Sequence, residues 1–264
     1  MDPTIIHAEL EPLEDIEARI SKTFAVLEKV ANGVVRGNIK SIIVSGAAGC
    51  GKTYTLDRVL GKAKGDGLIH YQSVKGSMSA IGLYRQLWEC REAGSVLVID
   101  DCDSIFADLD ALNLLKAALD TTKTRMVHWN KESRVLDDEG IDRSFEFDGA
   151  VVFITNIDFS AEIEADRKMT PHYRALLSRC MYVDLGIHNK REILVRIGQV
   201  VFSQSFLRES GMSKAEAKQM MAWITRNLNR VRTLSIRTVL QLASLIKTDN
   251  DWESMAASLM LRSR

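Results

Sequence analysis

The sequence predicts an α/β fold, in which a parallel sheet is flanked by helices and followed by an all-helical C-terminal part. Three observations carry this prediction. Fully apolar runs at residues 96–99 and 151–154 suit strands that are buried on both faces of a parallel sheet. Amphipathic stretches with helical spacing separate these runs. From residue 189 onward the apolar pattern is helical throughout.

Length and composition describe an ordinary globular chain. Its 264 residues are 46% apolar and 27% charged, which suits one or two domains with a sizeable core. No apolar run reaches the length that spans a bilayer, and residues 1–4 lack the basic and apolar regions of a signal peptide. We therefore expect no membrane partner and a cytoplasmic location. The four cysteines are scattered without the spacing of metal ligands, which suits reduced thiols and predicts no structural zinc.

The net charge is zero, but it is divided unevenly along the chain. Residues 189–264 contain 13 Lys and Arg against 6 Asp and Glu, whereas residues 1–188 contain 22 against 29. A basic C-terminal part suits a surface that faces nucleic acid. It suits equally a set of solvated helix faces, so both interpretations stay open.

The elements follow from periodicity and from turn residues. Residues 13–34 predict an amphipathic helix, with Ile16, Ile20 and Phe24 on one side. The pattern then predicts a strand at 42–44, a helix at 53–60, a strand at 68–74 and a helix at 79–91. A strand at 96–99, a helix at 105–120, a hairpin of strands at 125–129 and 144–147, and strands at 151–155 and 181–185 follow in that order. The C-terminal part opens with a helical stripe at 193–201. Three further helices follow there, one behind a capping box at Ser213 and the others at 235–246 and 251–261.

A glycine-rich motif follows the first strand and opens a helix. It consists of Gly46, Ala47, Ala48, Gly49, Cys50, Gly51, Lys52 and Thr53. This order is typical of a phosphate-binding loop, because glycines turn backbone N–H groups toward an anion and the helix adds its positive end. Lys52 would reach the β- and γ-phosphates, and Thr53 would join a Mg²⁺ shell. With Tyr54, these residues form the predicted nucleotide site, and ATP and Mg²⁺ are the expected cofactors.

A second motif places acidic residues at the end of the buried strand at 96–99. Acids in this position are costly unless a cation or water lies at the carboxyl edge of the sheet. We predict that Asp100 supports Mg²⁺ and that Asp101 orients the attacking water, with Asp103 as a weaker substitute for Asp101. The alternative is a surface cluster of acids that caps the next helix.

These motifs together resemble the AAA+ ATPases over nearly the whole chain. Residues 46–53 match Walker A and residues 96–101 match Walker B. Asn156 stands where the family has its sensor-1 residue, which helps to position the attacking water, and Arg237 matches the sensor-2 arginine that touches the γ-phosphate. The resemblance implies an ATPase that converts ATP to ADP and phosphate. It also implies a homo-oligomer, such as a hexameric ring.

Two narrower resemblances concern the middle of the chain. Ser178, Arg179 and Cys180 look like the Ser-Arg-Cys motif of clamp-loader subunits, in which the arginine enters the ATP site of the neighbouring subunit as a finger. The alternative is an arginine that is simply solvated. Local segments at 115–120, 127–129 and 145–147 resemble AAA+ proteins encoded by bacteriophages, which implies the cytoplasm of a host cell.

The chain departs from the AAA+ pattern at two places. Walker B usually ends in Asp-Glu, and here it ends in Asp100 and Asp101, so the shorter second side chain predicts slow turnover. The hairpin at about 124–149 is inserted before the sensor-1 strand, where insertions in related motors engage DNA or a protein partner, an argument by analogy.

Three tasks remain open at this stage. A DNA motor or loader in replication, recombination or packaging is favoured by the basic C-terminal part and by cations at Lys75, Arg125, Lys131, Arg134 and Arg143, although acids at 137–142 lie among them. A protein remodeller is disfavoured because the loop at 75–78 has no aromatic residue. An ATP-controlled assembly switch acting on a protein partner suits slow turnover at Asp101.

The predicted domain organisation has three segments. Residues 1–37 form an N-terminal helix that leads into the core. Residues 38–188 form the α/β nucleotide-binding domain, and the hairpin is an insertion within it. Residues 189–264 form the helical lid.

Overall fold

The computed structural model describes residues 11–187 and 189–262, so the expectation about residues 1–4 lies outside the described part. The chain divides into two compact units. Among the described residues, we call 23–47 and 51–186 the α/β unit, and 11–22, 48–50, 187 and 189–262 the helical unit. No helix within the described ranges is long and apolar enough to cross a membrane.

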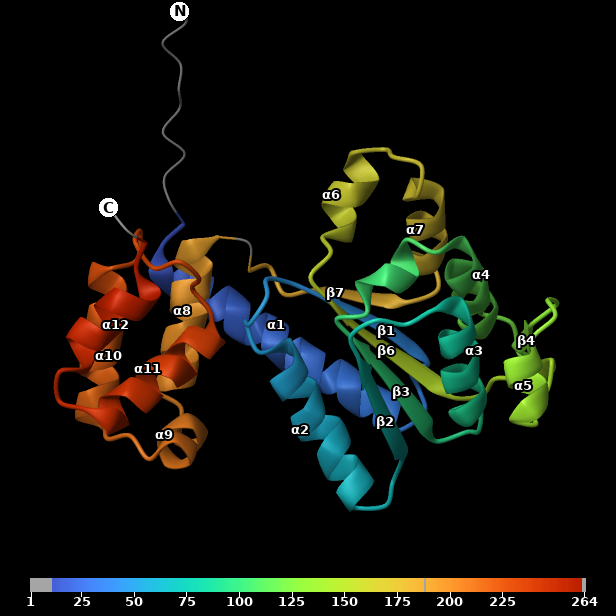
Figure 1. Cartoon of the computed structure of the whole chain (residues 1–264), viewed down its shortest axis with the longest axis horizontal. Coiled ribbons are helices and arrows are strands. Elements are labelled where there is room, and N and C mark those ends of the chain that lie inside the picture. Colours follow the sequence, from blue (N-terminus) through green and yellow to red (C-terminus); the bar gives the residue numbers. More distant parts are fainter. Residues whose placement is uncertain (1–10, 188, 263–264) are drawn as a thin grey trace, which may run out of the picture. The chain divides into compact units, whose positions relative to one another are not determined.

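The α/β unit is built on a five-stranded sheet in which every neighbouring pair of strands is parallel. The strand order is β2-β3-β6-β1-β7 (Figure 1). The strands are β1 (Ser41–Ser45), β2 (His70–Lys75), β3 (Ser95–Asp100), β6 (Ala150–Thr155) and β7 (Met181–Asp184). All residues of β1, β3 and β6 are buried, as their apolar runs predict for the interior of a parallel sheet.

The register of the sheet brings a set of polar residues to its carboxyl edge. Ser45 pairs with Thr155, Asp100 pairs with Ile154, and Lys75 pairs with Asp100. Lys75 is therefore the last residue of β2, whereas the sequence pattern placed it in the following loop. Ligands of open parallel sheets bind outside this edge, so a functional site is expected there.

Helices cover both faces of this sheet (Figure 1). One face is covered by α2 (Lys52–Gly65) and the part of α1 (Leu13–Val35) that belongs to the α/β unit. The other is covered by α3 (Ala80–Glu89), α4 (Leu109–Ala118) and α7 (Thr170–Leu177), whose side chains Leu87, Leu115 and Leu176 join the strands in one apolar cluster. A short helix α6 (Phe159–Glu164) precedes α7.

The helix predicted at 105–120 is interrupted. A 3-10 turn η1 (Asp103–Phe106) comes first, and α4 begins only after Asp108. The carboxylate of Asp108 accepts hydrogen bonds from the backbone N–H groups of Asp110 and Ala111, so it caps α4. Aspartate at this position stabilises a new helix start, which explains the break.

The inserted hairpin pairs β4 (Met126–His128) with β5 (Ser144–Glu146) in the antiparallel arrangement expected from its alternating pattern. The connecting segment contains the short helix α5 (Arg134–Asp138), because the hydroxyl of Ser133 caps it by accepting a hydrogen bond from Leu136 N. The hairpin packs on α3: the ring of Tyr84 lies 5.2 Å from that of Phe145, centroid to centroid. The insertion is therefore part of the apolar core.

The helical unit contains α8 (Lys190–Val201), α9 (Gln204–Ser210), α10 (Lys214–Arg226), α11 (Ile236–Thr248) and α12 (Trp252–Met260). Capping boxes open α8, with Asn189 and Glu192, and α10, with the predicted Ser213 and Glu216. Helix α9 was not predicted from the pattern, because its seven residues are too few to show a period.

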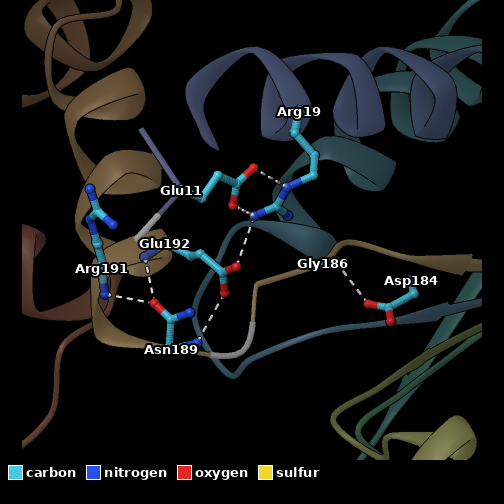
Figure 2. A network of polar contacts seen from close by, with 7 residues as sticks. All are labelled: Glu11, Arg19, Asp184, Gly186, Asn189, Arg191 and Glu192. Carbon is cyan, nitrogen blue, oxygen red and sulfur yellow. Dashed lines mark hydrogen bonds and ion pairs between the residues drawn. The ribbon is translucent and has the colours of Figure 1, made fainter. Parts of the chain in front are cut away.

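The start of α8 is also joined to α1 within the helical unit (Figure 2). The guanidinium of Arg19 donates to Glu11 at 2.9 Å and to Glu192 at 2.8 Å, and Glu192 is buried. The hydrogen bond from Arg19 lowers the pKa of the Glu11 carboxyl below its ordinary value. A buried carboxylate needs such a cationic partner, so α1 and α8 depend on each other.

Candidate functional site

The glycine-rich loop connects β1 to α2 with a backbone that side chains would not permit. Gly49 has φ +70°, and a Cβ there would lie 2.7 Å from the Cβ of Ser235. Gly51 has φ 100° and stands at the N-cap of α2 without any side-chain hydrogen bond. The first N–H groups of α2 are therefore not capped by the residue before them, which is the arrangement that accepts an anion.

The tip of the loop, residues 48–50, clusters with the helical unit. The carbonyl of Gly49 accepts from Ile236 N at 2.9 Å, and the carbonyl of Cys50 accepts from Arg196 Nε at 3.2 Å. Both carbonyls are thus held by helices α11 and α8. Arg237, the predicted sensor-2 residue, directly follows Ile236 and is exposed.

Lys52 is buried, with 5% of its surface exposed, as the first residue of α2. Its ammonium donates to the carbonyl of Gly46 at 2.6 Å, to the carbonyl of Ala47 at 3.1 Å and to Asn156 Oδ1 at 2.8 Å. The two polar residues that the sequence assigned to Walker A and sensor 1 are therefore in direct contact. A buried ammonium that is held by neutral oxygens is well placed to receive an anion.

Asn156 continues this chain of contacts to Walker B. Its Nδ2 donates to Asp101 Oδ1 at 2.9 Å, so one amide joins Lys52 to Asp101. Asp101 has φ 54°, in the left-handed region. Aspartate and asparagine tolerate that region better than longer side chains do. This backbone suits an aspartate at position 101.

The other carboxylate of the predicted Walker B motif, Asp100, is 3% exposed and has two polar partners. The hydroxyl of Thr53 lies 3.2 Å from Asp100 Oδ1 and 3.1 Å from Oδ2, and the ammonium of Lys75 lies 3.0 Å from Oδ2. The hydrogen bond to Asp100 raises the pKa of Lys75 above its ordinary value. The sequence-based prediction missed this role of Lys75. This role depends on the pairing of β2 with β3, which no local sequence pattern gives.

Two further predicted residues lie beside this cluster. Asp103 accepts a hydrogen bond from Thr155 Oγ1 at 2.6 Å, so its carboxylate joins η1 to β6. Tyr54 is 54% exposed on α2 and does not join the contacts of Lys52 and Asp100 described above.

Arg179 lies at the amino ends of the strands, opposite the carboxyl edge that carries Asp100 and Asn156. It precedes β7, and its carbonyl accepts from Ser41 Oγ at 2.7 Å, at the amino end of β1. Its guanidinium donates to the carbonyl of Ala175 at 2.7 Å, and its Nε lies 3.9 Å from Asp120 Oδ1. The glycine-rich loop follows the carboxyl end of β1, so Arg179 is remote from the Lys52 cluster of its own chain.

The oxygen atoms of Thr53 and Asp100 suit a hard divalent cation such as Mg²⁺, which takes one or two protein carboxylates with water and phosphate oxygens. Within the described residues no group of three or more His, Cys, Asp or Glu side chains could hold a metal ion by itself. The ammonium of Lys75 stands on the Asp100 carboxylate as a positive charge, which shows that this place favours a cation. The residues present therefore fit Mg²⁺ that arrives with a phosphate ligand.

Comparison with known proteins gives one sequence relative and a set of structures with the same fold. The chain is 49% identical over 247 residues to an uncharacterized 36.7 kDa protein from the nrdC-mobD intergenic region of enterobacteria phage T4, covering 93% of this chain and 76% of that protein. No protein-family model matches the chain.

Two solved structures share the fold at low sequence identity. Domain III of the replication initiation protein DnaA from Thermotoga maritima matches with a TM-score of 0.55 and 10% identity, over 92% of each chain. NtrX from Brucella abortus, solved in complex with ADP, matches with a TM-score of 0.53 and 11% identity, over 89% of this chain and 50% of the other. At these identities the likeness concerns the fold alone. The chain has the AAA+ fold and belongs to the same family as the phage T4 protein.

Proposed function

We propose that this protein binds and hydrolyses ATP. The observation that carries the proposal is the line of contacts at the carboxyl edge of the sheet, from Lys52 through Asn156 to Asp101. Next to it, Thr53 and the buried Asp100 face each other. This set supplies a cation for phosphates, oxygens for a metal and a carboxylate for water, which are the parts that phosphoryl transfer needs.

Each residue receives one task in this proposal. The uncapped start of α2 and Lys52 bind the phosphates, and Thr53 and Asp100 hold Mg²⁺, which when bound neutralises charge on the phosphate oxygens. Asp101 orients the attacking water by accepting its hydrogen bond, and Asn156 fixes that carboxylate. The resemblance to AAA+ proteins assigns the γ-phosphate contact to Arg237.

The site is completed by a second copy of the chain. Arg179 lies at the sheet edge away from its own Lys52, so it is in no position to serve its own nucleotide. A guanidinium placed on the transferring phosphate by a neighbour is a large catalytic factor. We therefore propose a homo-oligomer, such as a ring, in which Arg179 acts on the adjacent subunit.

Nucleotide binding is tested by Lys52→Ala. Loss of the ammonium removes the charge opposite the β- and γ-phosphates, so the affinity for ATP is expected to fall at least about a hundredfold. Calorimetric titration with ATP measures this. The matched control is Lys62→Ala, on the same helix, because Lys62 is exposed. Equal ATP affinity in Lys52→Ala and wild type contradicts the proposal.

DNA is the polymer that we propose for this ATPase, and the support comes from the basic charge of residues 189–264. The hairpin gives the DNA proposal less support than its basic residues suggest in the sequence. Arg125 is buried and donates to the carbonyls of Ala118 and Gly149, Lys131 pairs with Asp110, and Arg143 pairs with Asp137. Arg134 is exposed and remains available on the hairpin.

The DNA proposal predicts a defined salt dependence. Binding at low salt is expected to weaken as salt rises, and Arg134→Ala is expected to reduce the slope of log affinity against log salt by about one unit. Fluorescence anisotropy with single- and double-stranded oligonucleotides measures the slope. Arg58→Ala on α2 is the control, because Arg58 is exposed and paired with Glu28. Absence of binding by wild type at low salt excludes DNA as the polymer.

The two other candidate tasks are separated by one ATPase assay. Stimulation by unfolded protein alone supports a remodeller, although the segment at 76–78 after β2 has no aromatic residue to grip a polypeptide. A rate that no polymer changes, together with assembly that depends on ATP, supports a switch. Stimulation by DNA alone supports the proposed function.

A further inference from the structure

The proposed function gives Lys75 no task of its own. Lys75 ends β2, and its ammonium lies 3.0 Å from Asp100 Oδ2. The same carboxylate faces the Thr53 hydroxyl at 3.1 and 3.2 Å. The positively charged Lys75 thus contacts a carboxylate that the proposed function assigns to the binding of Mg²⁺.

The burial of Asp100 makes a cationic partner necessary. The side chain of Asp100 is 5% exposed, and an ionised carboxylate in such a place is costly without a cation. Lys75 supplies that cation, although its own side chain is 57% exposed. While no divalent ion is bound, the ammonium of Lys75 therefore balances the negative charge of Asp100.

The ammonium is also free to leave. Lysine carries its charge on a flexible four-carbon stem, and more than half of the Lys75 side chain is exposed to solvent. Gly76 follows with φ 97°, and a Cβ built there meets no atom within 4 Å, so the space beside the end of β2 is open. Withdrawal of Lys75 into water requires a side-chain rotation and no movement of the sheet.

We propose that Lys75 is a built-in counter-ion that makes the metal site conditional on nucleotide. A free divalent ion has to displace an ammonium from Asp100 in a place where Lys52 adds further positive charge. A divalent ion that arrives with a triphosphate brings negative charge, so displacement of Lys75 becomes favourable. This inference rests on the proposed function, because it assigns Thr53 and Asp100 to the metal.

The inference is tested by metal binding without nucleotide. Manganese(II) is the probe, since it takes the same carboxylate and hydroxyl oxygens as Mg²⁺ and its free form is measured directly by electron paramagnetic resonance. Lys75→Met is expected to bind Mn²⁺ at least about tenfold more tightly than wild type. Lys75→Arg keeps the charge and is expected to match wild type. Lys62→Met, which removes an exposed lysine from α2, is the control for net charge.

A stability measurement accompanies the titration. Without metal, Lys75→Met leaves Asp100 buried without its cation, so its melting temperature is expected to be lower than that of wild type. Added Mn²⁺ is expected to restore it, with a larger increase than in wild type. The double variant Lys75→Met with Asp100→Asn removes both charges and is expected to lose the gain in Mn²⁺ affinity.

The outcomes separate this inference from the proposed function. If Lys75→Met binds Mn²⁺ no more tightly than wild type, or binds none, Lys75 is a structural partner only and the inference is wrong. If wild type also binds no ATP in the titration that tests Lys52, the proposed function itself fails. An equal gain in Lys62→Met assigns the effect to net charge and overturns the role of Lys75.

Discussion

An Asp101→Asn variant is expected to bind ATP as wild type does and to hydrolyse it at least about a hundredfold more slowly, because a neutral amide attracts the proton of water far less than a carboxylate does. The fold is expected to survive. Asparagine tolerates the left-handed backbone at φ 54°, and its amide oxygen can still accept the hydrogen bond from Asn156 Nδ2. Single-turnover measurement of phosphate release, beside calorimetric ATP affinity, separates the two steps.

Asp103→Asn is the matched control for this prediction. The carboxylate of Asp103 accepts a hydrogen bond from the Thr155 hydroxyl, and an asparagine oxygen can accept the same bond. Turnover is therefore expected to stay close to that of wild type. Full turnover in Asp101→Asn together with loss in Asp103→Asn would move the water-orienting role to Asp103.

The longer side chain is expected to be tolerated poorly at this position. Asp101→Glu gains reach toward the water, but a glutamate in the left-handed region costs about 1 kcal/mol of folding free energy. A lower melting temperature is therefore expected for Asp101→Glu than for Asp101→Asn, and thermal unfolding measures it. Equal melting temperatures would show that this backbone places no restriction on residue 101.

Arg179→Ala is expected to lower the ATPase rate of the assembled protein by about a thousandfold or more while leaving ATP binding intact. Lys52→Ala is expected to be inactive for the other reason, because it does not hold ATP. A mixture of the two is expected to regain activity, since some interfaces join an intact Lys52 to an intact Arg179. The regained rate is measured as a function of the mixing ratio.

Dilution of wild type provides the control for a shared site. Specific activity is expected to fall as the protein becomes monomeric, as followed by light scattering on the same samples. Arg179→Lys keeps the charge but loses the fork that donates to Ala175 O, so partial activity is expected. A wild-type monomer with undiminished specific activity would contradict the finger role of Arg179.

The fold was predictable because its signals are local and repeated. Buried parallel strands are apolar along their whole length, and the glycine-rich loop has its residues in one short segment. The prediction missed two features, and each has a local cause. Asp108 starts a new helix by capping it, and the seven residues of α9 show no period.

The identities of the main site residues were predictable from the sequence, but the contacts between them were not. Asp100 and Asn156 are recognisable in the sequence because the first ends a strand and the second directly follows one, and Lys52 is recognisable because it belongs to the glycine-rich motif. The pairing of Lys75 with Asp100 depends on the register of two strands that are 20 residues or more apart, which no local pattern gives. Arg125 reads as a surface cation in an alternating strand, and only its burial against Phe147 shows otherwise.

The packing of the hairpin on α3 has a consequence for how this family diverges. Tyr84 contacts the rings of Trp129 and Phe145 and donates its hydroxyl to the carbonyl of Asp142 at 2.6 Å. A descendant that shortens or replaces the hairpin uncovers this tyrosine and leaves its hydroxyl without that acceptor. Substitutions at residue 84 and at residues 129 and 145 are therefore expected to be inherited together, so that lineages with a different hairpin also carry a different α3.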